Sequence, residues 1–240
     1  MLTVTQGDRE GDIGGERLTA SPSLPVRLLV VDDHPAVRLG LLQLLEDQWD
    51  FEVVAVSETA ESAVARAEHH GVNVAVVDYH LGGRNGLWIS RKLKRSPRPP
   101  AVIIFSAYAS DHLAANCRVA GADALLNKGA LGSELCDAIR SVSRGRQLLP
   151  RVPQPLADML RRRLDDSEQP LFGMLMAGIP RIVIRQTLGM SARELASRED
   201  TMLSKLEALP GEGSDSSRGR GALDNRRVVA PAPSTNPVPR

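Results

Sequence analysis

Short apolar runs alternate with amphipathic stretches between residues 26 and 144. The runs are rich in β-branched residues and bounded by turn formers, which is typical of buried strands. We predict strands at 26–31, 51–56, 73–79, 100–107 and 122–127, with helices at 36–48, 59–70, 87–95, 110–120 and 131–144. Such alternation needs crossover connections and therefore indicates a parallel sheet, and the apolar strands indicate helices on both faces. The predicted fold class is α/β, a doubly wound (βα)5 domain at 25–146.

Beyond this domain the strand pattern stops. A proline-broken linker is predicted at 147–160, with a short helix at 156–164, and three helices follow before residue 206. Gly189 would end the second of these helices, and Ser191 with Glu194 forms the capping-box pattern that starts the third. The segment 161–209 is therefore predicted to be a small all-α helix-turn-helix domain. Polar, Gly/Pro/Ser-rich sequence predicts a disordered arm at 1–24 and a disordered tail at 210–240.

Composition narrows the class of protein only slightly. Hydrophobic residues make up 42% and charged residues 25% of the 240 residues, and the net charge of +1 argues against a strongly basic nucleic-acid binder. Cys117 and Cys136 lie in predicted helices and are interpreted as buried thiols in a reducing compartment. No apolar run approaches the roughly 18 residues of a membrane-spanning helix, and no signal core is present. We expect a cytoplasmic protein without membrane association.

Polar residues lie at the carboxyl ends of four of the predicted strands. Ligands bind beyond the carboxyl ends of parallel strands, so these residues should share one cleft: Asp32, Asp33, Asp78, Ser106 and Lys128. Three carboxylates repel one another unless a cation lies among them, and an all-oxygen site suits Mg²⁺. A lysine and a hydroxyl can bind phosphoryl oxygens. The carboxylate of Asp78, on the central strand, is the one best placed to attack phosphorus and form an aspartyl-phosphate.

Segments 28–41, 76–87, 103–110 and 121–130 contain LLVVDDHPAVRLGL, VVDYHLGGRNGL, IIFSAYAS and GADALLNKGA. In order and spacing they resemble the signature stretches of the flavodoxin-like receiver domain of two-component response regulators. The resemblance implies that Asp78 accepts a phosphoryl group from a sensor histidine kinase, and that Asp32 and Asp33 hold Mg²⁺ with the main-chain carbonyl of His80. It makes Ser106 the switch hydroxyl and Lys128 the phosphate-pairing lysine.

Two positions depart from the receiver pattern. Gly82 replaces a usual proline, which affects rigidity rather than chemistry. Leu125 replaces the switch aromatic, and a leucine cannot swing between two environments as a ring does. Whether phosphorylation is coupled to the surface is therefore left open. The five histidines form no cluster with metal-ligand spacing and are interpreted as solvated or capping residues.

Residues 164–206 resemble, without gaps, the DNA-binding domain of the LuxR/NarL class, which follows a receiver domain in this order. In the third helix we predict a buried side formed by Ala192, Leu195, Met202, Leu203 and Leu206. Candidate nucleic-acid contacts are Arg193, Ser197, Arg198 and Lys205. They are balanced by Glu194, Glu199 and Asp200, which oppose the charge of the DNA backbone.

These observations favour a homodimeric DNA-binding transcriptional regulator that is controlled by phosphorylation and is not an enzyme. The acidic third helix keeps a second hypothesis open, in which the C-terminal domain binds protein partners or dimerises without sequence-specific DNA binding. A phosphatase built on the same sheet is a third possibility, because His80 could supply a general acid beside Asp78.

Overall fold

The computed structural model describes residues 24–208, apart from residue 131. The predicted disordered segments therefore lie almost wholly outside the described residues. Five parallel strands form one sheet in the order β2-β1-β3-β4-β5. The strands are β1 (Val26–Val31), β2 (Phe51–Ser57), β3 (Val74–Asp78), β4 (Ala101–Ser106) and β5 (Ala124–Asn127). The predicted parallel, doubly wound sheet is confirmed.

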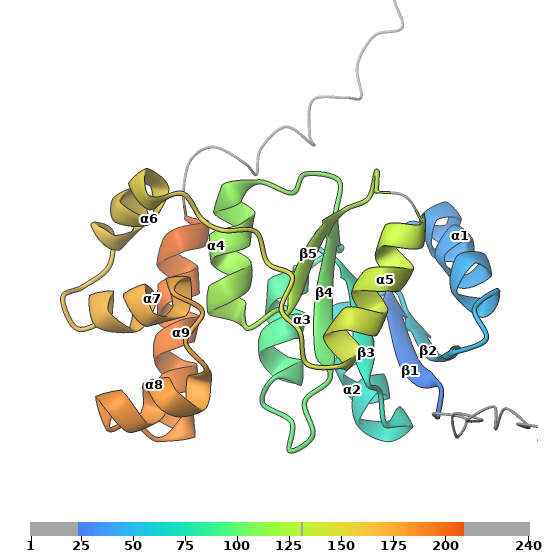
Figure 1. The fold of residues 1–240 in the computed structure, drawn as a ribbon, viewed down its shortest axis with the longest axis horizontal. Helices are drawn as coiled ribbons and strands as arrows, with labels where there is room; N and C mark the ends of the chain where they lie inside the picture. The colour runs from blue at the N-terminus through green and yellow to red at the C-terminus, as the bar shows by residue number, and fades with distance from the viewer. Residues whose placement is uncertain (1–23, 131, 209–240) are drawn as a thin grey trace, which may run out of the picture.

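Helices cover both faces of the sheet (Figure 1). The helices of the first domain are α1 (Pro35–Glu46), α2 (Ala60–His70), α3 (Gly86–Leu93), α4 (Asp111–Ala120) and α5 (Gly132–Ser143). Successive strand residues point to opposite faces, so Leu28 and Val30 pack in a core with α1 and α5, whereas Leu29 and Val31 pack in a core with α2, α3 and α4. Cys117 and Cys136 are both buried and free, as predicted.

Four further helices lie on the outer side of α4 (Figure 1). They are α6 (Gln154–Arg161), α7 (Gln169–Met176), α8 (Arg181–Leu188) and α9 (Ala192–Glu207). Helix α6 occupies part of the range predicted as a linker, because Pro155 suits a first helical turn. Gly189 ends α8 with φ 64°, and the capping box of Ser191 and Glu194 starts α9. The predicted helical C-terminal region is therefore present.

The C-terminal helices share an apolar core with the first domain. Helix α4 contacts α6, α7 and α9, and its buried residues belong to the same cluster as Phe172, Ile184 and Met202. This packing corrects the predicted buried side of α9: Ala192 is exposed, whereas Glu199 is buried. Residues 25–146 and 161–208 are thus two sequence units that share one of the two apolar cores, the one on the α4 side of the sheet.

Candidate phosphoryl-transfer and metal site

The carboxyl end of the central strands carries a cluster of charged side chains. Asp78 is the last residue of β3, and its carboxylate is 3% exposed; Asp32 follows β1 and is 1% exposed. Lys128 follows β5, and its backbone N–H donates a hydrogen bond of 2.8 Å to the carbonyl of Ser106 at the end of β4. The ends of β1, β3 and β5 therefore bring the lysine side chain next to the two aspartates.

Lys128 is the shared cation of this cluster. Its Nζ lies 2.8 Å from Oδ2 of Asp78 and 2.7 Å from Oδ2 of Asp32. Burial raises the pKa of Asp78, as does the neighbouring charge of Asp32, and these effects outweigh the opposing effect of Lys128. For Lys128, burial disfavours the charged form, but the hydrogen bonds to Asp32 and Asp78 leave the pKa raised overall. The lysine is therefore held as a cation beside a partly desolvated carboxylate.

Asp33 occupies the outer side of the cluster. Its Oδ2 accepts a hydrogen bond of 3.1 Å from the backbone N–H of Gly82. A proline at position 82 would have no N–H to donate, so the departure from the receiver pattern has a structural role here. The sequence signal was the absence of proline, since any other residue at position 82 has a backbone N–H to donate.

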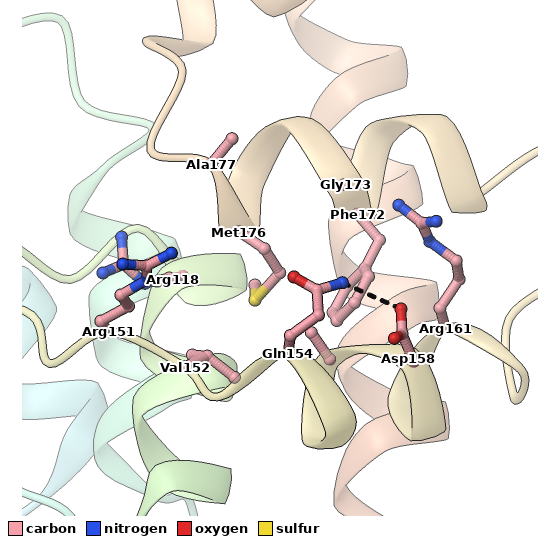
Figure 2. A pocket seen from close by; sticks show the side chains of 11 residues that line it. Arg118, Arg151, Val152, Gln154, Asp158, Arg161, Phe172, Gly173, Met176 and Ala177 are labelled. Atoms are coloured by element: carbon pink, nitrogen blue, oxygen red, sulfur yellow. Dashed lines mark hydrogen bonds between the residues drawn. The ribbon is translucent and has the colours of Figure 1, made fainter.

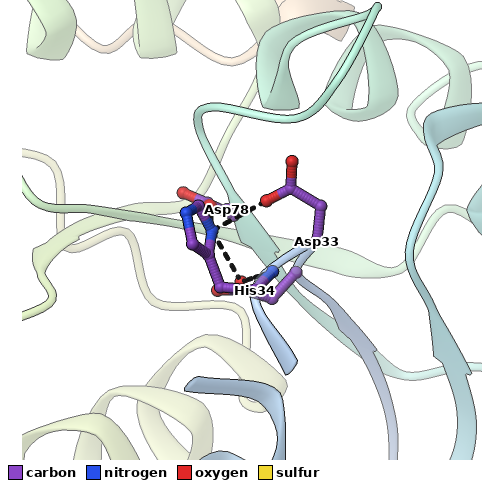
Figure 3. Close-up of side chains that lie close together, drawn as sticks. Asp33, His34 and Asp78 are labelled. Carbon is purple, nitrogen blue, oxygen red and sulfur yellow. Dashed lines mark hydrogen bonds and ion pairs between the residues drawn. The ribbon is translucent and has the colours of Figure 1, made fainter. Parts of the chain in front are cut away.

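His34 also belongs to the site: its side chain is 66% exposed, as a solvated histidine would be, but it corrects the interpretation that no histidine forms a ligand cluster with carboxylates. Its Nδ1 lies 2.8 Å from Oδ1 of Asp33 and 3.9 Å from Oδ2 of Asp78 (Figure 3). Ligand atoms of Asp32, Asp33, His34 and Asp78 all lie within 4.8 Å of one another. The sequence signal for a role of His34 at the site was that it directly follows Asp32 and Asp33.

The donor set suits a divalent cation. Oδ1 of Asp33 and Oδ2 of Asp78 are buried, and their close neighbours are Nδ1 of His34 and Nζ of Lys128, each at 2.8 Å. Buried carboxylates are costly unless cations compensate their charge. Three carboxylates beside one lysine leave an excess of negative charge, so the residues present fit Mg²⁺.

Ser106 and His80 border the cluster. The Ser106 side chain is fully buried, and its Oγ donates to the carbonyl of Tyr108 at 3.3 Å and accepts from the N–H of Tyr108 at 3.2 Å. The backbone N–H of His80 donates to Oδ1 of Asp78 at 3.2 Å. Leu125 of β5 is buried in the apolar core on the α4 side of the sheet, where its side chain packs against other apolar residues.

The candidate nucleic-acid residues on α9 fall into two groups. Arg193 and Ser197 are exposed. Arg198 donates a hydrogen bond of 2.9 Å to the carbonyl of Ser167, and Nζ of Lys205 lies 2.7 Å from Oε2 of the buried Glu168. Two of the four predicted contacts therefore hold α9 against the start of α7.

Comparisons with known proteins agree with the fold and identify the family. The response regulator receiver domain family matches residues 28–140. The chain is 31% identical over 174 residues to the response regulator UvrY of Escherichia coli K12. The matched region covers 72% of this chain and 79% of UvrY. It is 30% identical over 191 residues to the DNA-binding transcriptional activator DevR/DosR of Mycobacterium tuberculosis, covering 75% of this chain and 88% of that protein.

Solved structures give the same result. A LuxR-family two-component response regulator from Aurantimonas has a TM-score of 0.51 and 28% identity, covering 56% of this chain and 97% of the other. The receiver domain of NarL from M. tuberculosis has a TM-score of 0.50 and 26% identity, covering 52% and 100%. The fold and the site thus define a response regulator receiver. The chain belongs to the NarL/LuxR family of two-component response regulators. Among the described residues, no helix is long and apolar enough to cross a membrane.

Proposed function

We propose that Asp78 accepts a phosphoryl group from a sensor histidine kinase. The observation that carries this proposal is the pairing of a buried carboxylate at the end of β3 with Lys128 Nζ at 2.8 Å. A carboxylate oxygen of Asp78 attacks phosphorus, and the bond from phosphorus to the kinase histidine breaks, with its electron pair leaving on that nitrogen. The ammonium of Lys128 neutralises charge on the phosphoryl oxygens. The hydroxyl of Ser106 donates to one of them after it turns from Tyr108.

Asp32, Asp33 and Asp78, with the main-chain carbonyl of His80, would hold Mg²⁺ at this site. When bound, Mg²⁺ supplies electrostatic stabilisation of the transferring phosphoryl group. Gly82 positions Asp33 through its N–H, and Lys128 restrains Asp32 and Asp78 from the opposite side. These contacts hold the carboxylates in place before any ligand arrives.

Phosphorylation with a small donor tests this assignment. The full chain is incubated with acetyl phosphate and Mg²⁺, and intact-mass spectrometry measures the addition of a phosphoryl group. Asp78→Asn should abolish the addition, whereas Asp47→Asn, which changes an exposed carboxylate elsewhere on the receiver, should not. Equal phosphorylation of Asp78→Asn and the unchanged chain would overturn the assignment.

For the output we propose DNA binding as a homodimer. Relatives in the family include a DNA-binding transcriptional activator, and residues 191–194, at the N-terminal end of α9, are all exposed. Base contacts in helix-turn-helix proteins come from this end of the recognition helix. Arg193 and Ser197 lie on its exposed side. Dimerisation would match two-fold symmetric half-sites.

A DNA selection with the full chain, with and without beryllium fluoride and Mg²⁺, tests the output. Sequence-specific DNA should be enriched, and Arg193→Gln should weaken binding about tenfold, because one guanidinium contact is lost. Arg146→Gln, in the connection after α5, is the matched control. Light scattering reports the dimer. Failure to enrich any sequence in either state would refute DNA recognition while leaving the phosphorylation proposal intact.

A protein-binding output is the second candidate. It is favoured by the charge of α9, where Arg198 and Lys205 are engaged within the C-terminal unit and Glu199 and Asp200 pair with the receiver. Pull-downs with the full chain should then recover a protein partner in amounts that nuclease treatment does not change. Loss of the partner after nuclease treatment would instead support the DNA output.

A further inference from the structure

A cavity of about 490 Å³ lies where α4 of the receiver meets the C-terminal helices. It is bounded by α4, by residues 151–152 of the connecting segment, and by α6 and α7 (Figure 2). This volume lies within the range of small-molecule sites, about 300–1,000 Å³. The cavity is remote in sequence from the carboxylate cluster and shares no residue with it.

Three arginines line the cavity: Arg118 from α4, Arg151 from the connecting segment and Arg161 at the end of α6. Within the part of the chain that the structure describes, the guanidinium groups of Arg151 and Arg161 make neither a hydrogen bond nor an ion pair. The one carboxylate in the lining is Asp158, which accepts a hydrogen bond of 3.0 Å from Gln154. The lining therefore carries two positive charges in excess.

Arg118 provides the strongest indication of a missing partner. Its Nη2 donates to the carbonyls of Leu149 and Pro150 at 3.1 and 3.0 Å, which fixes the guanidinium at the cavity edge. Its Nε is buried and has no acceptor. A buried donor of a charged group without a partner is costly, so an acceptor brought by a ligand would be favoured.

The remaining wall is apolar. Phe172 and Val152 are buried and line the cavity, as does Ala157, and Met176 lies between Arg118 and Arg161 (Figure 2). A flexible thioether beside an aromatic ring adapts to a small apolar group. The wall therefore suits a ligand that has a compact apolar body in addition to its charge.

We infer that this cavity binds a small organic phosphate, with the doubly charged oxyanion at the end that carries Arg118 and Arg151 and the apolar body against Phe172 and Met176 (Figure 2). Two excess positive charges match a phosphomonoester dianion, and guanidinium groups bind phosphate through paired hydrogen bonds. Because Arg118 belongs to the receiver, and Phe172 and Met176 to the C-terminal helices, the ligand bridges the two units. Its binding stabilises their packed arrangement.

Calorimetric titration of the full chain with phenylphosphonate tests the inference. The C–P bond of this probe cannot transfer a phosphoryl group to Asp78, so binding is measured without phosphorylation. In mildly alkaline buffer we expect saturable binding of one probe per chain. Arg151→Gln should weaken it about tenfold, the value of one charge-assisted contact, whereas Arg161→Gln, at the opposite end of the cavity, and Arg146→Gln should leave it nearly unchanged. No saturable binding, or equal affinity in all four proteins, would overturn the inference.

Two further probes test the chemistry of the ligand. Inorganic phosphate lacks the apolar body and benzoate lacks the second charge, so both should bind more weakly than phenylphosphonate. Equal affinity for inorganic phosphate would refute the apolar contact, and equal affinity for benzoate would refute the charge match.

Discussion

Arg91 of α3 and Glu199 of α9 form a salt bridge in which the side chains are only 6% and 5% exposed. The same guanidinium binds Asp200 and the carbonyl of Ala196, and Arg181 of α8 binds Glu199 from the other side at 2.8 Å. Residues that oppose DNA binding by charge thus have a structural use, because they attach the last helix to the receiver.

Removing one partner of this bridge should destabilise the whole protein. Glu199→Gln leaves the buried Arg91 with less compensation, and breaking a buried pair costs about 3 kcal/mol. Urea unfolding of the full chain measures the change in the free energy of unfolding. Glu46→Gln, at an exposed position on α1, is the control and should change it by less than about 0.5 kcal/mol. An equally small change in Glu199→Gln would show that the bridge does not hold α9.

A second ion pair should make stability depend on pH. Both carboxylate oxygens of Asp50 accept hydrogen bonds from Arg140, at 2.8 and 2.9 Å. The hydrogen bond from Arg140 lowers the pKa of Asp50 below 3.8, despite partial burial. A lowered carboxyl pKa contributes stability above the unfolded-state value, and this contribution is lost as pH falls through the folded-state value.

Asp50→Asn should therefore cost about 1 kcal/mol at neutral pH, and the difference from the unchanged chain should shrink as the pH falls below 3.8. Urea unfolding at neutral and acidic pH measures both differences. Asp137→Asn removes a 78% exposed carboxylate that contacts the same arginine at 3.4 Å, and it should have little effect at either pH. A pH-independent cost for Asp50→Asn would contradict the assignment.

The hydrogen bond from Gly82 to Asp33 should matter for Mg²⁺. Gly82→Pro removes the donor, so Asp33 is less well positioned, and the affinity for Mg²⁺ should fall about tenfold. Gly82→Ala keeps the N–H and serves as the control, since a Cβ there meets only Oδ2 of Asp33, at 3.9 Å. Calorimetric titration with MgCl2 measures both. If Gly82→Pro binds Mg²⁺ as tightly as Gly82→Ala, the N–H does not position the ligand.

The start of α9 depends on its capping box. The Ser191 hydroxyl accepts from the N–H of Glu194 at 3.2 Å, and the carboxylate of Glu194 accepts from the N–H of Ser191 at 2.8 Å. Ser191→Ala should cost about 1 kcal/mol in the free energy of unfolding. Ser197→Ala, within the helix, should be neutral or slightly stabilising, because alanine has the higher helix propensity. Similar effects of the two substitutions would argue against the cap.

Much of the receiver could be predicted from the sequence because strand ends converge in a parallel sheet. The positions of Asp78 and Lys128 at the carboxyl ends of β3 and β5, on either side of β4, follow from the apolar runs that precede them. The burial of Glu199 could not be predicted, because helical periodicity assigns a charged residue to the exposed side of a helix. The arginine that compensates its burial, Arg91, is 108 residues away in the chain. The role of His34 was missed for a related reason: spacing rules detect ligands on one element, but this histidine meets Asp78 across two strands.

Because α4 and the C-terminal helices share a core, the receiver and the C-terminal helices cannot be separated into fragments without exposing apolar surface. A receiver cut after residue 146 would bare the apolar side of α4, and the released helices would lose the surface on which Met202 and Leu206 pack. Both fragments would be prone to aggregate. A chimera that grafts these helices onto a foreign receiver would have to carry the matching side of α4, together with Arg91, to retain its solubility.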